Sequence, residues 1–350
     1  MLQDSATTSP APTAPASETA HAPILEVRNL RTVFYGKGGA TPAVRDVSLS
    51  LRRAETLGLV GESGCGKSVT SLSILRLVPP RAGRIESGEV RYAGRDLLAL
   101  DEAEMRRIRG GEIAMIFQEP MTALNPVMTV GRQIEETLRL HDPAMTAARA
   151  RDRAAEMLSL VHIPEPQRQL GRYPHQFSGG MRQRAMIAMA LACNPKVLIA
   201  DEPTTALDVT IQAQILELMR ELQSLLGTAI LMITHDLGVI AETASRVAVM
   251  YAGRKVEEAG VEALFAAPLH PYTHGLMRAI PSLDDAPAGS GRRRLHAIPG
   301  TVPSLGEGLA GCAFAPRCPS ATDACRRADP PLEERGPGHW VACWHPGSAA

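Results

Sequence analysis

Aromatic residues are scarce in this 350-residue chain: Phe, Trp and Tyr together make up 3% of it. Single-stranded nucleic acid is usually bound by aromatic side chains that stack on the bases, so this scarcity argues against such a surface. An excess of charge is also lacking, because Lys and Arg together count 37 and Asp and Glu together count 37. Nothing in the overall charge therefore favours nucleic acid or an anionic membrane as a partner.

Long apolar runs are absent as well. No run approaches the roughly 20 residues of a membrane-spanning helix, so if the protein works at a membrane, we expect other chains to span it. Residues 1–22 are rich in Ala, Thr, Ser and Pro and lack the apolar core of a signal peptide, which predicts a disordered tail on a cytosolic protein. The chain is nevertheless 45% hydrophobic. It can bury a large core, and its length predicts two or three domains.

What the chain does contain is a phosphate-binding pattern, G-x-x-x-x-G-K-[ST], at residues 61–68. Its glycines allow backbone N–H groups to turn toward a triphosphate, and Lys67 and Ser68 are the residue types that meet the outer phosphates and Mg²⁺. Residues 56–60 predict a buried strand before the loop, and residues 69–77 predict a helix after it. This context distinguishes the pattern from an ordinary Gly-rich turn.

The first part of the chain, residues 24–51, has the pattern of strands with a turn at residues 36–39. Phe34 and Tyr35 stand just before that turn. The position suits an aromatic ring stacked on a nucleotide base, and it suits a core aromatic equally well.

Three further apolar runs each lead into polar residues. They are residues 113–117 before Gln118, residues 197–200 before Asp201 and Glu202, and residues 229–233 before Thr234 and His235. Continuous apolar runs of this length suit strands that are buried on both faces of a parallel sheet. Open sheets of that kind bind ligands at the carboxyl ends of their strands. We therefore expect these polar side chains to converge on one nucleotide.

Between the runs that end at Gln118 and Asp201, helical spacing from about residue 130 to residue 176 predicts an inserted helical subdomain. Ser178, Gly179 and Gly180 then open another helix. Ser178 is a good N-cap, and the two glycines leave the first-turn N–H groups open to a phosphate. Such a start is usually only a cap, but here it precedes the strand that ends in two carboxylates.

Taken together, these motifs closely resemble the nucleotide-binding subunit of ABC transporters. All six family motifs occur in the family's order between about residues 24 and 265: Walker A at residues 61–68, the Q-loop at Gln118, the signature at residues 178–180, Walker B and its glutamate at Asp201 and Glu202, the D-loop at residues 205–208, and the switch histidine at His235. The departures are Phe177 and Met181, where the commonest signature carries Leu and Gln. The Ser and both Gly are intact.

The resemblance implies an α/β fold: a P-loop NTPase-type ABC ATPase domain with a helical subdomain, plus a small Cys-rich C-terminal extension. The implied divisions are a disordered tail at 1–22, an ATP-binding domain at 23–265 with its helical subdomain at about 119–178, and an extension at 266–350. It also implies Mg²⁺-dependent ATP hydrolysis by a dimer, in which the signature of one subunit closes over the phosphate loop of the other.

Site roles are carried over from the family onto matching positions. Phosphoryl transfer to water needs positioning and charge neutralisation more than covalent help. In isolation, Asp201 and Glu202 suit a solvated loop pair and His235 a structural histidine, but the ordered set favours catalysis. The expected catalytic residues are Glu202, which polarises water, His235, which steadies the γ-phosphate, and Gln118, which reports to the helical insert. The expected magnesium ligands are Ser68, Gln118 and Asp201. The expected nucleotide-binding residues are Phe34, Gly61, Glu62, Ser63, Gly64, Cys65, Gly66, Lys67, Ser68, Val69, Ser178, Gly179, Gly180 and Asp208.

After residues 247–251, which we expect to form the last strand, the composition changes. A Pro/Gly-rich segment at 281–311, including Arg292, Arg293 and Arg294, predicts a solvated loop. Cys65 and Cys193 lie apart from the other cysteines and are expected to be isolated, reduced thiols.

Four cysteines cluster near the end of the chain, with five, six and seventeen residues between successive members: Cys312, Cys318, Cys325 and Cys343. In a cytosolic protein such a cluster favours a metal over disulfides. The wide spacing lacks the close pairs of structural zinc sites and suits an iron-sulfur cluster. His339 and His345 keep zinc open as an alternative, and unmetallated thiols are a third.

This extension, with His270, Pro271 and Tyr272 followed by the cysteines, resembles the C-terminal region of ATP-binding subunits from oligopeptide/dipeptide importers. The resemblance implies a 4Fe-4S cluster on the four cysteines and a peripheral location at the cytoplasmic face of the membrane. It also implies partners: a second ATP-binding subunit, identical or different, two transmembrane permease subunits and an extracytoplasmic solute-binding protein, but no nucleic acid.

The expected function is therefore ATP hydrolysis that energises uptake of di- or oligopeptides or related solutes, with nickel and other small solutes left open. The alternative is a soluble ABC-type ATPase acting on nucleic acid or ribosomes, which the single cassette and balanced charge disfavour. A purely regulatory nucleotide-binding module is disfavoured because Glu202 and His235 are both present.

Overall fold

A computed structural model describes residues 22–36, 39–118, 123–205, 207–280, 297–303 and 310–348. The expected disordered tail lies outside these residues except for its last position. Also outside them are Ala206 of the D-loop motif and, within the expected solvated loop, residues 292–294.

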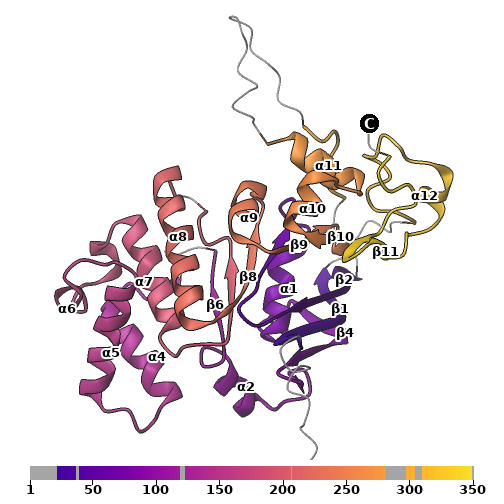
Figure 1. Ribbon diagram of the computed structural model, residues 1–350. Coiled ribbons are helices and arrows are strands. Elements are labelled where there is room, and N and C mark those ends of the chain that lie inside the picture. Colours follow the sequence, from indigo (N-terminus) through magenta and orange to yellow (C-terminus); the bar gives the residue numbers. More distant parts are fainter. Residues whose placement is uncertain are drawn as a thin grey trace, which may run out of the picture.

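Two sheets form the centre of the molecule (Figure 1). The smaller is antiparallel in the order β2-β1-β4-β5. The larger has the order β11-β12-β10-β9-β3-β8-β7-β6, with parallel pairing from β9 to β6 and antiparallel pairing from β9 to β11. The strands are β1 (Leu25–Gly36), β2 (Gly39–Leu51), β3 (Thr56–Val60), β4 (Gly83–Tyr92), β5 (Arg95–Asp96), β6 (Ile113–Ile116), β7 (Val197–Asp201), β8 (Ala229–Thr234), β9 (Arg246–Tyr251), β10 (Arg254–Gly260), β11 (Glu333–Gly336) and β12 (His339–Val341).

The parallel strands of the larger sheet carry the site. Every residue of β3, β7 and β8 is buried, as expected for strands whose two faces are both covered. Because β3, β8, β7 and β6 are neighbours and run in one direction, their carboxyl ends meet at one edge. The four apolar runs of the sequence are these four strands.

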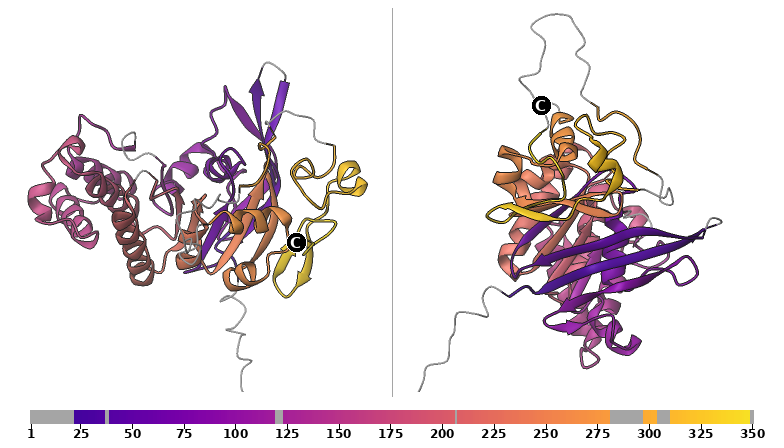
Figure 2. Two further views of the ribbon diagram at one scale, coloured as in Figure 1. Left: turned by 90° about the horizontal axis from the view of Figure 1, so that it is seen from above. Right: turned by 90° about the vertical axis from the view of Figure 1, so that its right-hand side faces the viewer.

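Helices cover the sheets and also form a separate lobe from α4 to α7 (Figures 1 and 2). This lobe lies in the chain between β6 and β7, where the helical insertion is predicted. The helices are α1 (Lys67–Ile74), α2 (Glu102–Ile108), α4 (Val130–His141), α5 (Ala147–Leu160), α6 (Pro166–Gln169), α7 (Gly179–Leu191), α8 (Val209–Leu226), α9 (Leu237–Thr243), α10 (Val261–Ala266), α11 (Pro271–Arg278) and α12 (Asp323–Arg327), with a 3₁₀ turn at Pro174–Gln176.

Local sequence accounts for the lobe. Thr129 and Thr146 cap α4 and α5 by accepting hydrogen bonds from backbone N–H groups in the first turns. Val130, Ile134 and Leu138 recur at helical spacing and are buried against the neighbouring helices.

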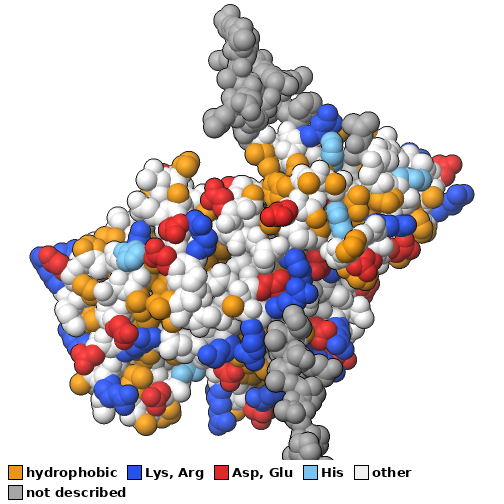
Figure 3. All heavy atoms as spheres, in the orientation of Figure 1, with side chains coloured by type: hydrophobic (Ala, Val, Ile, Leu, Met, Phe, Trp, Pro, Cys, Tyr) orange, Lys and Arg blue, Asp and Glu red, His pale blue; other side chains and the backbone are white. Residues whose placement is uncertain are grey.

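The surface carries Lys and Arg interspersed with Asp and Glu on the face shown in Figure 3, in keeping with the balanced charge. Among the described residues, none of the helices has both the length and the apolar character that crossing a membrane requires.

One strand prediction is wrong: β9 is not the last strand, because β10, β11 and β12 follow it. The strand β12 pairs with β10 through Glu257 opposite Val341 and Glu258 opposite Trp340. The sequence of β10, RKVEEAG, lacks an apolar pattern, and its acidic side chains are buried by tertiary partners instead. The C-terminal segment thus enlarges the same sheet that carries the site.

Candidate active site

The loop between β3 and α1 needs its glycines for two reasons. Gly61, Gly64 and Gly66 have φ of +154°, +81° and +104°, which side chains rarely tolerate. A Cβ on Gly61 would lie 2.3 Å from the carbonyl oxygen of Met250, and one on Gly66 would lie 2.5 Å from that of Ala43. Conformation therefore favours glycine at all three positions, and space requires it at Gly61 and Gly66.

Lys67 places its ammonium group inside this loop. Its Nζ donates to the carbonyl oxygens of Gly61 at 2.7 Å and Glu62 at 3.2 Å, and the residue is only 5% exposed. The first turn of α1 starts at Lys67, so its unpaired N–H groups face the same side. A cradle that has no room for a Cβ at Gly61 or Gly66 and is lined by amides and one ammonium fits a triphosphate.

Ser68 and Asp201 form a hydrogen bond at the carboxyl edge of the sheet. The Ser68 hydroxyl donates to Asp201 Oδ1 at 3.1 Å, although the two come from α1 and the end of β7. Burial raises the pKa of Asp201, and the hydrogen bond from Ser68 partly opposes this. A hydroxyl and a buried carboxylate are ligands that suit Mg²⁺, whose charge would stabilise the ionised form.

The Glu202 carboxylate contacts residues that lie at the ends of three strands. Its carboxylate accepts from Gln118 Nε2 at 2.9 Å and from the Thr205 hydroxyl at 2.8 Å, and it lies 3.2 Å from His235 Nδ1. These residues follow β6, β7 and β8. The convergence expected from the apolar runs is what the structure shows for Gln118, Glu202 and His235.

The environment keeps Glu202 ionised. Burial alone would raise the pKa of its carboxyl, but the hydrogen bonds from Thr205 and His235 and the positive charge of Lys67 lower it overall. The side chain of the Glu202 anion is 11% exposed, and that of His235, which lies between it and solvent, is 59% exposed.

Within one chain the signature residues lie apart from the phosphate loop. Ser178 caps α7 by accepting from the N–H of Met181 at 3.3 Å, and Gly179 has no heavy atom within 4 Å of the place its Cβ would take. In Figure 1, α7 belongs to the helical lobe, and β8 lies between it and α1. Asp208 caps α8 by accepting from the N–H of Ile211 at 3.0 Å.

Phe34 lies half-buried in β1, opposite Thr41 of β2 and Gly83 of β4, and its neighbour Tyr35 is 48% exposed. Its stacking on a base stays a prediction. Cys65 is fully buried in the loop, where burial raises the pKa of its thiol.

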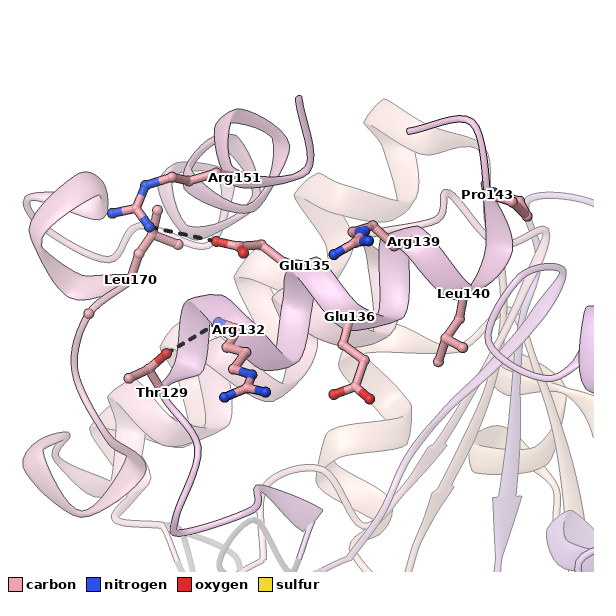
Figure 4. A pocket seen from close by; sticks show the side chains of 10 residues that line it. Thr129, Arg132, Glu135, Glu136, Arg139, Leu140, Pro143, Arg151 and Leu170 are labelled. Atoms are coloured by element: carbon pink, nitrogen blue, oxygen red, sulfur yellow. Dashed lines mark hydrogen bonds and ion pairs between the residues drawn. The ribbon is translucent and has the colours of Figure 1, made fainter. Parts of the chain in front are cut away.

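A pocket of about 740 Å³ lies in the helical lobe rather than at this site. It is lined by charged side chains of α4 together with Arg151 of α5, which pairs with Glu135 (Figure 4). None of the predicted site residues lines it.

The prediction of a 4Fe-4S cluster is wrong, and so is the zinc alternative. Cys312, Cys318, Cys325 and Cys343 all lie in the described part of the chain as free thiols. In that part there is no group of three or more His, Cys, Asp or Glu side chains that could hold a metal ion. Burial raises the pKa of Cys312 to about 11 and also raises the pKa of Cys318 and Cys343.

These cysteines instead take part in local packing. The N–H of Cys312 donates to the carbonyl oxygen of Cys325 at 2.8 Å, and Cys343 Sγ accepts from the N–H of His345 at 3.4 Å. Sequence spacing identified the cluster in the chain but not its geometry.

Sequence reasoning missed two residues at the phosphate loop, Tyr272 and Arg317, which both contact Glu62. They lie more than 200 positions beyond Glu62 in the chain, and no local pattern connects them to it. It also missed that the Thr205 hydroxyl binds Glu202.

Two known families match this chain. The ABC transporter family matches residues 44–205, and the C-terminal region of oligopeptide/dipeptide transporters matches residues 256–325. The chain is 58% identical to a probable peptide ABC transporter ATP-binding protein of Sinorhizobium fredii, covering 92% of this chain and 94% of that one. It is 52% identical to the oligopeptide transport ATP-binding protein of Bacillus subtilis, covering 92% of this chain and 89% of that one.

Solved structures agree with these matches. A bacterial ABC transporter cassette solved as a dimer is 30% identical, with a TM-score of 0.61 over 68% of this chain and 98% of that one. A second structure of the same cassette, a dimeric post-hydrolysis state bound to ADP and Pi, is 29% identical, with the same TM-score and coverage.

Proposed function

This chain belongs to the ATP-binding proteins of ABC transporters of the oligopeptide/dipeptide type, and on that premise we propose which of its residues bind and hydrolyse ATP. It is an ATPase subunit of an importer for peptides or related solutes. Nothing in its relatives favours the alternative of a soluble ATPase acting on nucleic acid or ribosomes.

One observation carries the assignment of roles: Glu202 is held by groups from three strand ends beside the Ser68–Asp201 pair. The loop amides and Lys67 neutralise the phosphate charge, and Ser68, Gln118 and Asp201 hold Mg²⁺. When bound, Mg²⁺ supplies positive charge to the phosphate oxygens.

Glu202 and His235 act on the two reactants, the attacking water and the γ-phosphate. The ionised Glu202 accepts a hydrogen bond from the attacking water and orients it toward the γ-phosphate. His235, which is 59% exposed in its side chain, donates to the γ-phosphate. The remaining nucleotide contacts are proposed as in the sequence analysis, including Phe34 at the base and Asp208 near the subunit junction.

The active form is a pair of ATP-binding subunits. The separation of the signature residues from the phosphate loop in one chain supports a site that a second subunit, identical or different, completes. The solved cassette described above is dimeric in both of its structures. Further proposed partners are two transmembrane permease subunits and an extracytoplasmic solute-binding protein, with the pair docked at the cytoplasmic face of the membrane. We keep 23–265 as the ATP-binding domain and 266–350 as the extension.

The test is Glu202→Gln in the full chain. We expect its Kd for ATP to stay within about twofold of the parental value, while phosphate release falls at least about 100-fold. Glu242→Gln is the matched control, because Glu242 is an exposed glutamate of α9 and is expected to leave both quantities unchanged. Hydrolysis by Glu202→Gln at the parental rate would remove the catalytic role.

A further inference from the structure

Glu62 of the phosphate loop is held by residues that lie outside the ATP-binding motifs. Its backbone N–H donates to the Tyr272 hydroxyl at 2.8 Å. Its carboxylate accepts from Arg317 Nη1 at 2.6 Å and Nη2 at 3.0 Å, a two-point contact that fixes direction as well as distance. Tyr272 and Arg317 both belong to the C-terminal segment.

Three groups other than Glu62 hold the Arg317 side chain in position. Its Nε donates to the carbonyl oxygen of Pro299 at 2.9 Å, Nη1 to the Tyr251 hydroxyl at 3.3 Å, and Nη2 to the carbonyl oxygen of Ile298 at 3.3 Å. With the two bonds to Glu62, all five guanidinium N–H donors have partners. The side chain is only 4% exposed, so the guanidinium cannot move without losing bonds.

Aromatic rings support the guanidinium and the tyrosine hydroxyl. The Tyr251 and Tyr272 rings lie 4.7 Å apart between centroids, and Phe314 lies 5.2 Å from Tyr251. The Arg317 guanidinium carbon lies 5.8 Å from the centroid of the Tyr251 ring and 5.9 Å from that of Phe314. These residues form a rigid wall behind one side of the phosphate loop.

The wall reaches the phosphate-binding lysine through one peptide. The carbonyl oxygen of Glu62 accepts from Lys67 Nζ at 3.2 Å, and the neighbouring carbonyl of Gly61 accepts from it at 2.7 Å. A shift of Glu62 therefore moves an acceptor of the lysine ammonium. Glu62 is bound at its N–H, its carboxylate and its carbonyl, and only the last of these bonds is internal to the loop.

We propose that Arg317 is a positioning residue for the phosphate loop: through Glu62, and with Tyr272, it sets the geometry in which Lys67 receives the triphosphate. The C-terminal segment thereby controls ATP affinity from outside the nucleotide site. Arg317 itself touches no substrate. The inference rests on the proposed nucleotide site.

The test measures Kd for ATP with Mg²⁺ by calorimetry on the full chain. We expect Arg317→Ala and Glu62→Gln each to weaken binding about tenfold, and the double variant to be no weaker than the worse single variant, because both act through one contact. Arg317→Lys keeps the charge but loses the two-point contact, so it should recover only part of the affinity. Kd values within twofold of parental for both single variants would overturn the proposal, as would fully additive losses.

The matched control is Asp329→Asn. Asp329 also ties the C-terminal segment to the ATPase strands, through ion pairs with Arg45 and Arg254, but it does not touch the loop. It should lower the Tm without changing the Kd for ATP. An equal loss of affinity in Asp329→Asn would show that any loosening of the segment suffices, and would contradict a specific role for Arg317.

Two further measurements keep the outcomes separate. If Arg317→Ala fails to fold, Tyr272→Phe decides, since it removes only the hydroxyl that accepts from Glu62; an unchanged Kd there would overturn the proposal. Lys67→Ala tests the nucleotide site on its own: retained ATP binding in that variant contradicts the proposed function, whereas lost binding leaves Arg317 to be judged by its own variants.

Thermodynamic linkage between ATP binding and the stability of the C-terminal segment gives a further test, because a purely structural contact would not make the segment respond to ATP. If Arg317 and Glu62 couple the segment to ATP, then ATP must stabilise the segment by the same factor. Amide hydrogen exchange in residues 312–319 should slow with Mg·ATP in the parental chain and should not slow in Glu62→Gln under saturating ATP. Equal protection in both chains would contradict the coupling.

Discussion

The backbone at Glu202 adopts a left-handed conformation, with φ of +48°, which is unfavourable for a residue with a side chain. Its N–H donates to the carbonyl oxygen of Ile233 at 2.8 Å, and its carboxylate accepts from Gln118 and Thr205. The position and charge of this carboxylate are therefore determined by its own loop and by the residues at the ends of the neighbouring strands β6 and β8.

This leads to a prediction for pH dependence. Because the folded-state pKa of Glu202 is lowered, its carboxylate stays ionised to a lower pH than that of an ordinary glutamate. Thr205→Val removes a hydrogen bond to the anion and should raise that pKa, moving the acid limb of the turnover profile up by about one pH unit. The measurement is phosphate release against pH, with Thr205→Ser as the control that keeps the hydroxyl. An acid limb that stays in place or moves down would contradict the assignment.

The loop glycines give a second prediction at this scale. Gly64→Ala meets open space and should cost only the left-handed backbone term of about 1–2 kcal/mol. Gly66→Ala meets the same kind of strain and, in addition, the Ala43 carbonyl oxygen at 2.5 Å. It should destabilise the chain more in urea denaturation, and equal losses in the two variants would show that the space around Gly66 does not matter.

At the scale of elements, periodicity and capping predicted what is locally encoded. The runs that became β3, β6, β7 and β8 are mainly apolar, and Val130, Ile134 and Leu138 mark the buried side of α4. By contrast, β10 was not predictable, because Glu257 and Glu258 are buried only by virtue of partners elsewhere.

Glu257 is the strongest test of that explanation. It is fully buried and accepts from the N–H groups of Leu269 at 2.7 Å and His270 at 3.0 Å, and its other partner is His339 Nε2 at 2.7 Å. Glu257→Ala leaves these groups without an acceptor and should lower the free energy of unfolding by about 3 kcal/mol.

The control for Glu257→Ala is Glu217→Ala on the exposed face of α8, where the ion pair with Arg220 is half exposed, so the change should stay within about 0.5 kcal/mol. Equal, small losses in both variants would mean that Glu257 does not hold the C-terminal segment in place.

At the scale of the whole molecule, the site is distributed over distant parts of the chain. The order of motifs predicted which side chains meet at the strand ends, because parallel strands end at one edge. It could not predict the wall formed by Tyr272, Phe314 and Arg317, nor the free thiols of the cysteine cluster. Both depend on how the residues after 266 pack against strands that lie much earlier in the sequence.

A charge at the signature tests the two-subunit site. Gly179→Asp adds a carboxylate in open space at the start of α7, where the helix dipole tolerates it, so the fold and the Kd for ATP of a single chain should not change. Facing the phosphates of a second subunit, it should lower turnover at least about tenfold. Gly179→Asn has nearly the same size without the charge and should lower it less. Parental turnover in Gly179→Asp would contradict a signature that faces phosphate.

The pairing of β12 with β10 has a practical consequence for shortened versions of this protein. A fragment ending at residue 265 matches the motif boundaries, yet it would strip the cover from β10 and present its bare N–H and C=O groups to any other chain. Such a fragment should accumulate in inclusion bodies, and crystallisation or screening efforts gain by retaining every residue through the final hairpin.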